Sequence, residues 1–266
     1  MPMVTSHTPA PGTRPQGAAT EREASEHVRR MFSDIAPRYD LLNRLLSLSF
    51  DRQWRRRTAA AFDHILRLPH ARVLDLCCGT GDLALALKRR ATHSCSPGAA
   101  IFGSDFAHPM LVRAAHKTAD SRATKELPGF AISYFEADAL RVPVPDATFD
   151  LITAAFGFRN LANYGAGLGE FYRLLRPGGE VGILEFVEPS GPLFGSLYRF
   201  YFRRILPWIG GAISGSGAAY SYLPASVSQF PRPEPLAEMM REAGFSDVGF
   251  TLWTGGIVAL HTGRRP

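Results

Sequence analysis

From residue 71 onward, the sequence alternates short apolar runs with segments of helical character, and no other feature limits the possible folds as strongly. Strands that alternate with helices at this spacing form βαβ units, and their strands pair in parallel. We therefore expect a parallel sheet with helices on its faces. The expected strands are 72–77, 100–105, 131–135, 149–155 and 180–186, and the expected helices between them are 82–91, 107–119 and 163–175.

The two flanks of this alternating region have other patterns. Residues 23–68 have helical character, with a start signal at Ser25 and a break at Pro37, so we expect a helical cap beside the sheet. Near the C-terminus, Gly255 and Gly256 separate two apolar runs, which is typical of a hairpin. Together these patterns predict an α/β, doubly wound, mostly parallel sheet of seven strands that ends in an antiparallel C-terminal hairpin.

Composition excludes several classes of protein. A chain of 266 residues with 45% hydrophobic residues can bury one large core, so we expect a single domain over residues 23–266. Residues 1–22 are rich in proline and poor in large apolar groups, which predicts a disordered tail. No apolar run is long enough for a transmembrane helix. Three cysteines favour a reducing compartment, so we expect a cytoplasmic protein, and the scattered histidines predict no metal site.

The most informative local motif runs from Val73 to Asp82, where a strand leads through a glycine turn into a helix. Gly79 and Gly81 allow a ligand to approach the backbone, and the helix N-terminus presents free N–H groups. About two dozen residues later, Asp105 ends the next strand, where a carboxylate can accept both hydroxyls of a ribose. The motif therefore predicts a nucleotide-type cofactor, although a turn that serves only packing also fits.

The acidic residues near this turn help to decide between two classes of cofactor. The glycine spacing suits the dinucleotide NAD(P), but Asp75 and Asp82 beside the phosphate position would repel a pyrophosphate. S-adenosylmethionine carries a sulfonium and an ammonium group, which carboxylates attract. Asp138 with Ala139 follows the third strand, where a carboxylate can bind an adenine amine and the next N–H a ring nitrogen. Three acids at the ends of three successive strands favour S-adenosylmethionine.

The sequence contains longer motifs at residues 39–43, 46–47, 54, 156–160, 176–179, 184–185, 219–224, 230–231 and 256–261. These motifs resemble those of the menaquinone and ubiquinone biosynthesis C-methyltransferases. The resemblance implies a Rossmann-like class I methyltransferase fold, with Thr80, Asp105, Asp138 and Ala139 at positions that contact the cofactor in that family. The sequence departs from the family at Ala155, where many members have a serine. The resemblance extends from about residue 26 to 264.

The resemblance implies C-methylation of a polyprenylated quinol ring, with demethylmenaquinol as the expected acceptor. The benzoquinol of ubiquinone biosynthesis, another small molecule and, more distantly, RNA remain open as alternatives. A ring carbon becomes nucleophilic when a neighbouring hydroxyl is ionised, so we expect Arg159 to stabilise a phenolate and Asn160 to orient that oxygen or a water. Tyr39 is expected to cover the cofactor or the substrate. In the simpler interpretation, Arg159 pairs with a surface acid, Asn160 caps the 163–175 helix and Tyr39 is a buried aromatic.

The basic residues suggest where such a substrate enters. The net charge of +6 favours an anionic partner, and part of it lies in residues 52–57 and in an aromatic and basic insertion, residues 189–231. Basic amphipathic helices suit a membrane interface, although such a stripe more often packs in a core. We expect both segments to contact an anionic membrane peripherally and to admit the polyprenyl tail. No recognised RNA-binding pattern appears, so we expect no nucleic-acid partner.

Overall fold

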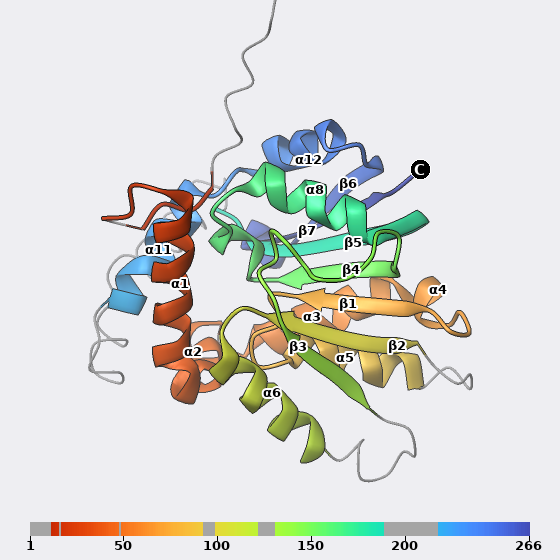
Figure 1. Cartoon of the computed structure of the whole chain (residues 1–266), viewed down its shortest axis with the longest axis horizontal. Helices are drawn as coiled ribbons and strands as arrows, with labels where there is room; N and C mark the ends of the chain where they lie inside the picture. The colour runs from red at the N-terminus through yellow and green to blue at the C-terminus, as the bar shows by residue number, and fades with distance from the viewer. Residues whose placement is uncertain (1–11, 16, 48, 93–98, 122–130, 189–217) are drawn as a thin grey trace, which may run out of the picture.

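The computed structural model describes residues 12–15, 17–47, 49–92, 99–121, 131–188 and 218–266. One seven-stranded sheet runs through the described part of the chain, in the order β3-β2-β1-β4-β5-β7-β6 (Figure 1). The strands are β1 (Arg72–Leu76), β2 (Ala100–Asp105), β3 (Ile132–Glu136), β4 (Phe149–Ala155), β5 (Leu175–Phe186), β6 (Ser246–Trp253) and β7 (Val258–Arg264).

The pairing of the strands confirms the predicted topology. The first five strands pair in parallel, and β7 pairs antiparallel with both β5 and β6. The predicted glycine pair lies in the connection between β6 and β7, within a short 3-10 helix, Thr254–Gly256. The chain order reverses between β1 and β4, and ligands of open α/β sheets bind at the carboxyl ends of strands at such a point.

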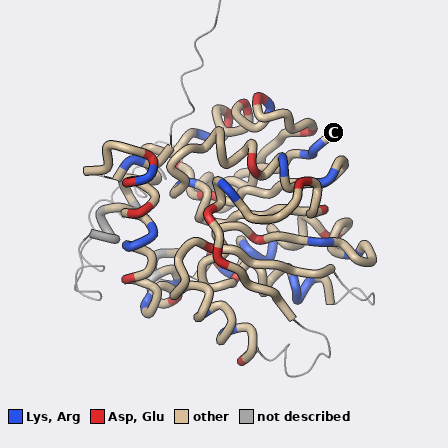
Figure 2. Tube along the Cα trace, viewed as in Figure 1, with Lys and Arg blue, Asp and Glu red and all other residues tan. Residues whose placement is uncertain are grey.

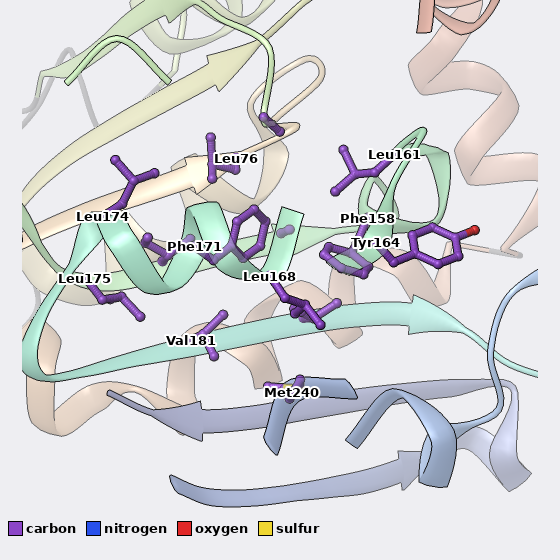
Figure 3. Packing of buried hydrophobic residues seen from close by; sticks show 14 of the residues in the cluster. Leu76, Phe158, Leu161, Tyr164, Leu168, Phe171, Leu174, Leu175, Val181 and Met240 are labelled. Carbon is purple, nitrogen blue, oxygen red and sulfur yellow. The ribbon is translucent and has the colours of Figure 1, made fainter. Parts of the chain in front are cut away.

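Alternating residues of the strands divide the core into two layers. Leu74 and Ile152 point to one face of the sheet, and Val73 and Leu151, one residue earlier on the same strands, point to the other. The first face packs against α8 (Tyr164–Leu174) and α12 (Pro233–Glu242), and Figure 3 shows the side chains of α8 in this layer. The second face packs against α3 (Phe50–Ala61), α4 (Asp63–Leu66) and α5 (Asp82–Thr92).

The N-terminal helices lie beside the sheet, as the sequence predicts, but the first one starts earlier. Helix α1 (Glu21–Ile35) begins after Thr20, whose hydroxyl accepts from the N–H of Glu23 while the Glu23 carboxylate accepts from the N–H of Thr20. The predicted start at Ser25 was wrong, because the capping box at Thr20 starts the helix earlier and Ser25 lies inside it. The predicted break at Pro37 is confirmed, because a 3-10 turn, Ala36–Arg38, separates α1 from α2 (Tyr39–Leu46).

Two predicted segments differ from expectation or fall outside the description. Thr13, in the segment predicted to be a disordered tail, is 3% exposed and is held by the folded chain. Most of the insertion, residues 189–217, lies outside the described residues, and its last part forms α11 (Ala218–Gln229). The remaining described helix is α6 (His108–Ala119). No helix in the described ranges combines the length and the apolar character that crossing a membrane requires.

Candidate cofactor and acceptor site

A pocket opens at the carboxyl ends of the central strands, at the reversal point between β1 and β4. The empty space in it, counted together with the solvent at its open mouth, is about 610 Å³. Acidic residues lie in the loops between the sheet and α1 (Figure 2). The lining residues are Ser25, Phe32, Tyr39, Cys77, Gly79, Asp105, Phe106, Met110, Ala137, Asp138, Ala139, Leu140, Phe156, Gly157, Asn160, Leu161 and Ala162.

The charge of the lining restricts the ligand. Asp105 and Asp138 are acidic, and the described lining contains no lysine, arginine or histidine. A pyrophosphate would lack a countercharge there, whereas a cationic ligand with hydroxyl groups would be attracted. Among the described residues, no group of His, Cys, Asp and Glu is arranged to hold a metal ion.

Asp105 joins the end of β2 to the glycine turn. Its Oδ2 accepts from the N–H of Gly79 at 2.8 Å, and its Oδ1 accepts from the N–H of Ala107 at 2.9 Å. Burial raises the pKa of Asp105 to about 6, so the carboxylate is ionised at neutral pH and retains lone pairs for ligand hydroxyls. Asp138 lies on an exposed turn after β3, where its Oδ1 accepts from the N–H of Leu140 at 2.9 Å, and Ala139 lies beside it.

Three residues predicted to bind the cofactor do not line the pocket. Asp75 is 1% exposed, and its carboxylate accepts from the Thr153 hydroxyl at 2.9 Å and from the N–H of Ala84 at 3.1 Å. Burial raises its pKa to about 7. Gly81 has a φ of +80°, and a Cβ there would lie 2.6 Å from the Tyr134 hydroxyl. These residues shape the turn and anchor α5 rather than face the pocket.

The third of these residues, Thr80, belongs to a charged network that also contains Asp82. The Thr80 hydroxyl donates to Asp40 at 2.6 Å, and Lys117 Nζ lies 2.8 Å from the carboxylates of both Asp40 and Asp82. Arg55 pairs with Asp51 and lies 3.8 Å from Asp82. Asp82 is therefore neutralised by basic residues on α6 and α3, and its predicted attraction for the cofactor stays a prediction.

Tyr39 lies opposite the glycine turn. It is the first residue of α2, and a Cβ placed on Gly79 would lie 3.5 Å from its ring. Phe32 packs edge-on against the Tyr39 ring, with centroids 6.1 Å apart. Burial raises the pKa of Tyr39, so its hydroxyl is a neutral donor and acceptor at the pocket wall.

A strained turn after β4 presents the second wall of the pocket. Phe156 has a φ of +61°, a left-handed conformation that costs an aromatic residue about 1–3 kcal/mol unless its surroundings enforce it. Its N–H donates to the Leu184 carbonyl at 2.8 Å. Its own carbonyl accepts from the side chains of Arg159 and Asn160. These contacts hold the Phe156 ring at the pocket.

Arg159 lies behind this turn in a buried ion pair with Glu185. Its backbone N–H and its Nη1 donate to the two carboxylate oxygens of Glu185 at 3.0 and 2.9 Å. Arg159 is 6% exposed and Glu185 is 0% exposed, and burial raises the pKa of Glu185. The Nε of Arg159 has no hydrogen-bond partner among the described residues. The simpler interpretation, in which Arg159 pairs with a surface acid, was wrong, because the acid is buried.

Asn160 lines the pocket directly. Its Oδ1 accepts from the Tyr222 hydroxyl at 3.0 Å. It does not cap α8, because Asn163 fills that position by accepting from the N–H of Ala166. Sequence reasoning missed Glu185 and Tyr222 as parts of this site. The available signals were an acidic residue inside the apolar run 180–186 for Glu185 and the family motif 219–224 for Tyr222, although that motif does not indicate the contact with Asn160.

The sheet order and the position of the pocket define a class of protein. A solved S-adenosylmethionine-dependent methyltransferase from Thermotoga maritima, described as a possible histamine N-methyltransferase, has the same fold. Its TM-score is 0.61 at 17% identity, over 90% of this chain and 100% of that chain. The chain therefore has the class I methyltransferase fold.

The sequence comparison narrows this class to a family. The chain belongs to the ubiE/COQ5 methyltransferase family, whose model matches residues 20–265. A demethylmenaquinone methyltransferase of Thermus thermophilus is 53% identical over 236 residues, covering 89% of this chain and all of the relative. A demethylmenaquinone methyltransferase of Deinococcus radiodurans is 48% identical over 245 residues, covering 92% and 95%. The resemblance predicted from the motifs is thus confirmed.

Proposed function

We propose that this enzyme methylates a ring carbon of demethylmenaquinol with S-adenosylmethionine as the methyl donor. Two demethylmenaquinone methyltransferases share about half of their residues with this chain over nearly its whole length. This similarity supports demethylmenaquinol as the methyl acceptor. The observation that carries the cofactor assignment is the pocket lining, which is acidic and free of basic side chains in its described part. A sulfonium compound with a ribose fits that lining, and a pyrophosphate does not.

The residues around the pocket suit this cofactor. We assign Asp105 to the ribose hydroxyls, the backbone at Gly79 to the methionine end, and Asp138 with Ala139 to the adenine. When bound there, S-adenosylmethionine supplies an electrophilic methyl group on a cationic sulfur. The protein has to align the acceptor carbon with that methyl and increase the electron density on the ring.

The turn after β4 is suited to activate the acceptor. An ionised hydroxyl on the quinol pushes electron density onto the neighbouring ring carbon, and N–H donors stabilise that charge. We propose that the side-chain N–H of Asn160 donates to the ionised hydroxyl. The positive charge of Arg159, behind Asn160, further stabilises the negative charge. Methylation leaves one proton on the ring carbon. Arg159 is a poor acceptor because the charge of Glu185 outweighs the effect of burial and raises the pKa of its guanidinium, so we assign the proton to a water held at Asn160.

The acceptor is tested by incubating the enzyme with labelled S-adenosylmethionine and each demethylated quinol in turn. We expect transfer to demethylmenaquinol at a higher kcat/KM than to the demethylated benzoquinol. Transfer to neither would refute the proposed function, and a preference for the benzoquinol would reassign the substrate.

Arg159→Lys tests the assigned mechanism. Lysine keeps the charge but cannot contact Glu185 and the Phe156 carbonyl with one planar group. We therefore expect kcat to fall about 10- to 100-fold, with the calorimetric affinity for S-adenosylhomocysteine changed by less than about threefold. Arg241→Lys, on the exposed part of α12, is the matched control. An unchanged kcat in Arg159→Lys would remove the electrostatic role.

We also propose that the enzyme meets its polyprenyl substrate at an anionic membrane surface. Arg52, Arg56 and Arg57 of α3 are exposed, whereas Arg55 is buried in the ion pair with Asp51 and is unavailable. Flotation with vesicles that contain anionic lipid should recover the wild type, and the Arg52→Gln/Arg56→Gln variant should be recovered at most half as well. Equal recovery with neutral vesicles would contradict this proposal.

A further inference from the structure

A short N-terminal segment lies across the outside of the pocket wall. Residues 12–15, here called the N-terminal strap, run along the loop that follows β4. The N–H of Thr13 donates to the Leu161 carbonyl at 2.8 Å, and Nη1 of Arg14 donates to the Ala162 carbonyl at 2.6 Å. Leu161 and Ala162 both line the pocket. The strap is therefore bonded to the backbone of the same loop that carries Asn160.

The packing of the strap is too close to be incidental. A Cβ placed on Gly12 would overlap the carbonyl of Ala162, so the backbones touch directly. Thr13 itself is buried, with 3% of its surface exposed. Arg14 also lies 3.6 Å from Glu21 in the first turn of α1. These contacts hold the N-terminal strap against the loop after β4 and against α1.

The Thr13 hydroxyl contacts a tyrosine that reaches into the site. Thr13 Oγ1 lies 3.0 Å from the hydroxyl of Tyr222, on α11, and the Tyr222 hydroxyl donates to Asn160 Oδ1 at 3.0 Å. A tyrosine hydroxyl has one proton. Because that proton goes to Asn160, Thr13 must donate to Tyr222. The hydrogen bonds therefore run in one direction, from Thr13 through Tyr222 to Asn160.

This direction determines which end of the Asn160 amide faces the substrate. The carbonyl oxygen is turned toward Tyr222, and Nδ2 is turned toward the Phe156 carbonyl, 3.4 Å away. That contact is long, so it orients the amide only weakly. An amide nitrogen has two N–H groups, and one remains for the acceptor oxygen. Without the Tyr222 proton, the amide can rotate and present a carbonyl oxygen, which repels a phenolate.

We propose that Tyr222 is a positioning residue that holds Asn160 with its N–H toward the ionised acceptor oxygen, and that the N-terminal strap holds Tyr222 in place. This inference rests on the role assigned to Asn160 in the proposed function. Under this proposal, residues 12–15 belong to the acceptor side of the active site. They act there together with α11, which lies in the C-terminal part of the chain.

The hydrogen bonds from Thr13 through Tyr222 to Asn160 are here called the relay. Three full-length variants test it by steady-state kinetics with demethylmenaquinol. Tyr222→Phe removes only the hydroxyl, and we expect kcat to fall about tenfold. Thr13→Val removes the donor to Tyr222 and keeps the shape, with an expected loss of about threefold. Because both act through Asn160, the double variant should equal Tyr222→Phe alone. The kcat profile of Tyr222→Phe should also move to higher pH, because the acceptor hydroxyl ionises less readily.

The controls separate positioning from folding. Tyr172→Phe removes a hydroxyl from a half-buried tyrosine on α8 and should leave kcat unchanged. The affinity for S-adenosylhomocysteine should stay within about twofold of wild type in each variant. Multiplicative effects in the double variant, or an unshifted pH profile in Tyr222→Phe, would overturn the relay. A wild type that methylates no quinol would instead refute the proposed function.

Discussion

Two carboxylates beside the glycine turn show how burial changes the chemistry of single residues. Asp75 and Asp105 both have a raised pKa, to about 7 and about 6, because burial penalises the charged form. Both carboxylate oxygens of Asp75 accept hydrogen bonds within the protein, from the Thr153 hydroxyl and from the N–H of Ala84. Asp105 lines the pocket and keeps capacity for a ligand. Two aspartates on neighbouring strands thus lie in different surroundings: Asp75 is bonded only within the protein, and Asp105 faces the pocket.

Asp75→Asn should change how stability depends on pH. A carboxyl whose folded pKa is raised contributes stability below its unfolded pKa of about 4, and loses it as the pH rises through about 7. Asparagine has no such loss. Relative to wild type, Asp75→Asn should therefore gain about 1–3 kcal/mol in unfolding free energy between pH 4.5 and pH 8, measured by urea denaturation.

The test compares the unfolding free energy of Asp75→Asn with that of the wild type at each pH. His261 is buried with its pKa lowered to about 4, so its contribution rises with pH over part of the same range and is common to both proteins. Asp150→Asn, at a partly exposed aspartate, is the control variant. A pH-independent difference between wild type and Asp75→Asn would show that Asp75 is ionised throughout.

At the scale of elements, the β1–turn–α5 unit depends on backbone conformations that few residues adopt. The turn places both glycines at positive φ, and at Gly81 the space for a Cβ is occupied by the Tyr134 hydroxyl. In the turn after β4 the residue at positive φ is not a glycine, because Phe156 is held in that conformation by the side chains of Arg159 and Asn160. Both unusual turns face the pocket, where a relaxed backbone would place different groups.

Gly81→Ala should damage the first of these turns. We expect a loss of about 1–3 kcal/mol in unfolding free energy, because the φ of +80° and the Tyr134 contact both oppose a Cβ. S-adenosylhomocysteine affinity should fall at least about tenfold by calorimetry, since the turn carries Gly79. Gly169→Ala, in α8 where no heavy atom lies within 4 Å of a new Cβ, should be neutral or stabilising. Equal behaviour of both variants would contradict this view of the turn.

At the scale of the whole molecule, a charged network joins the N-terminal helices to the sheet. Lys117 of α6 lies between Asp40 of α2 and Asp82 of α5, and Thr80 completes the contact. Tyr39, next to Asp40, covers the pocket from the same helix. The network therefore couples the position of the cap to the cofactor turn.

Lys117→Met should loosen that connection without unfolding the sheet. It leaves Asp40 and Asp82 without their shared countercharge, so α2 should separate more often. Hydrogen exchange across residues 39–46 should become about tenfold faster, while exchange in β1 and β4 stays unchanged. Arg113→Met, at an exposed position of the same α6, is the control. Unchanged exchange in residues 39–46 would show that other contacts hold the cap.

The sequence predicted the strands well because local patterns encode them. Short apolar runs that alternate with helical segments located the five parallel strands, and two apolar runs around one glycine pair located the antiparallel end. Helix α1 was placed several residues late, because a serine inside the helix looked like a cap and the true capping box at Thr20 was overlooked. Six of the ten predicted site residues line the pocket: Tyr39, Gly79, Asp105, Asp138, Ala139 and Asn160.

The amino-acid sequence by itself determined the α/β sheet, the family and the edge of the sheet where the pocket lies. These depend on periodicity and on motifs whose residues are neighbours in the chain. Only the tertiary structure decided that Asp82 is neutralised by Lys117, that Arg159 pairs with buried Glu185, and that Thr13 reaches Asn160 through Tyr222. Each of these contacts joins residues far apart in the sequence. Burial and hydrogen-bond direction then set their roles, and both arise only when the chain has folded.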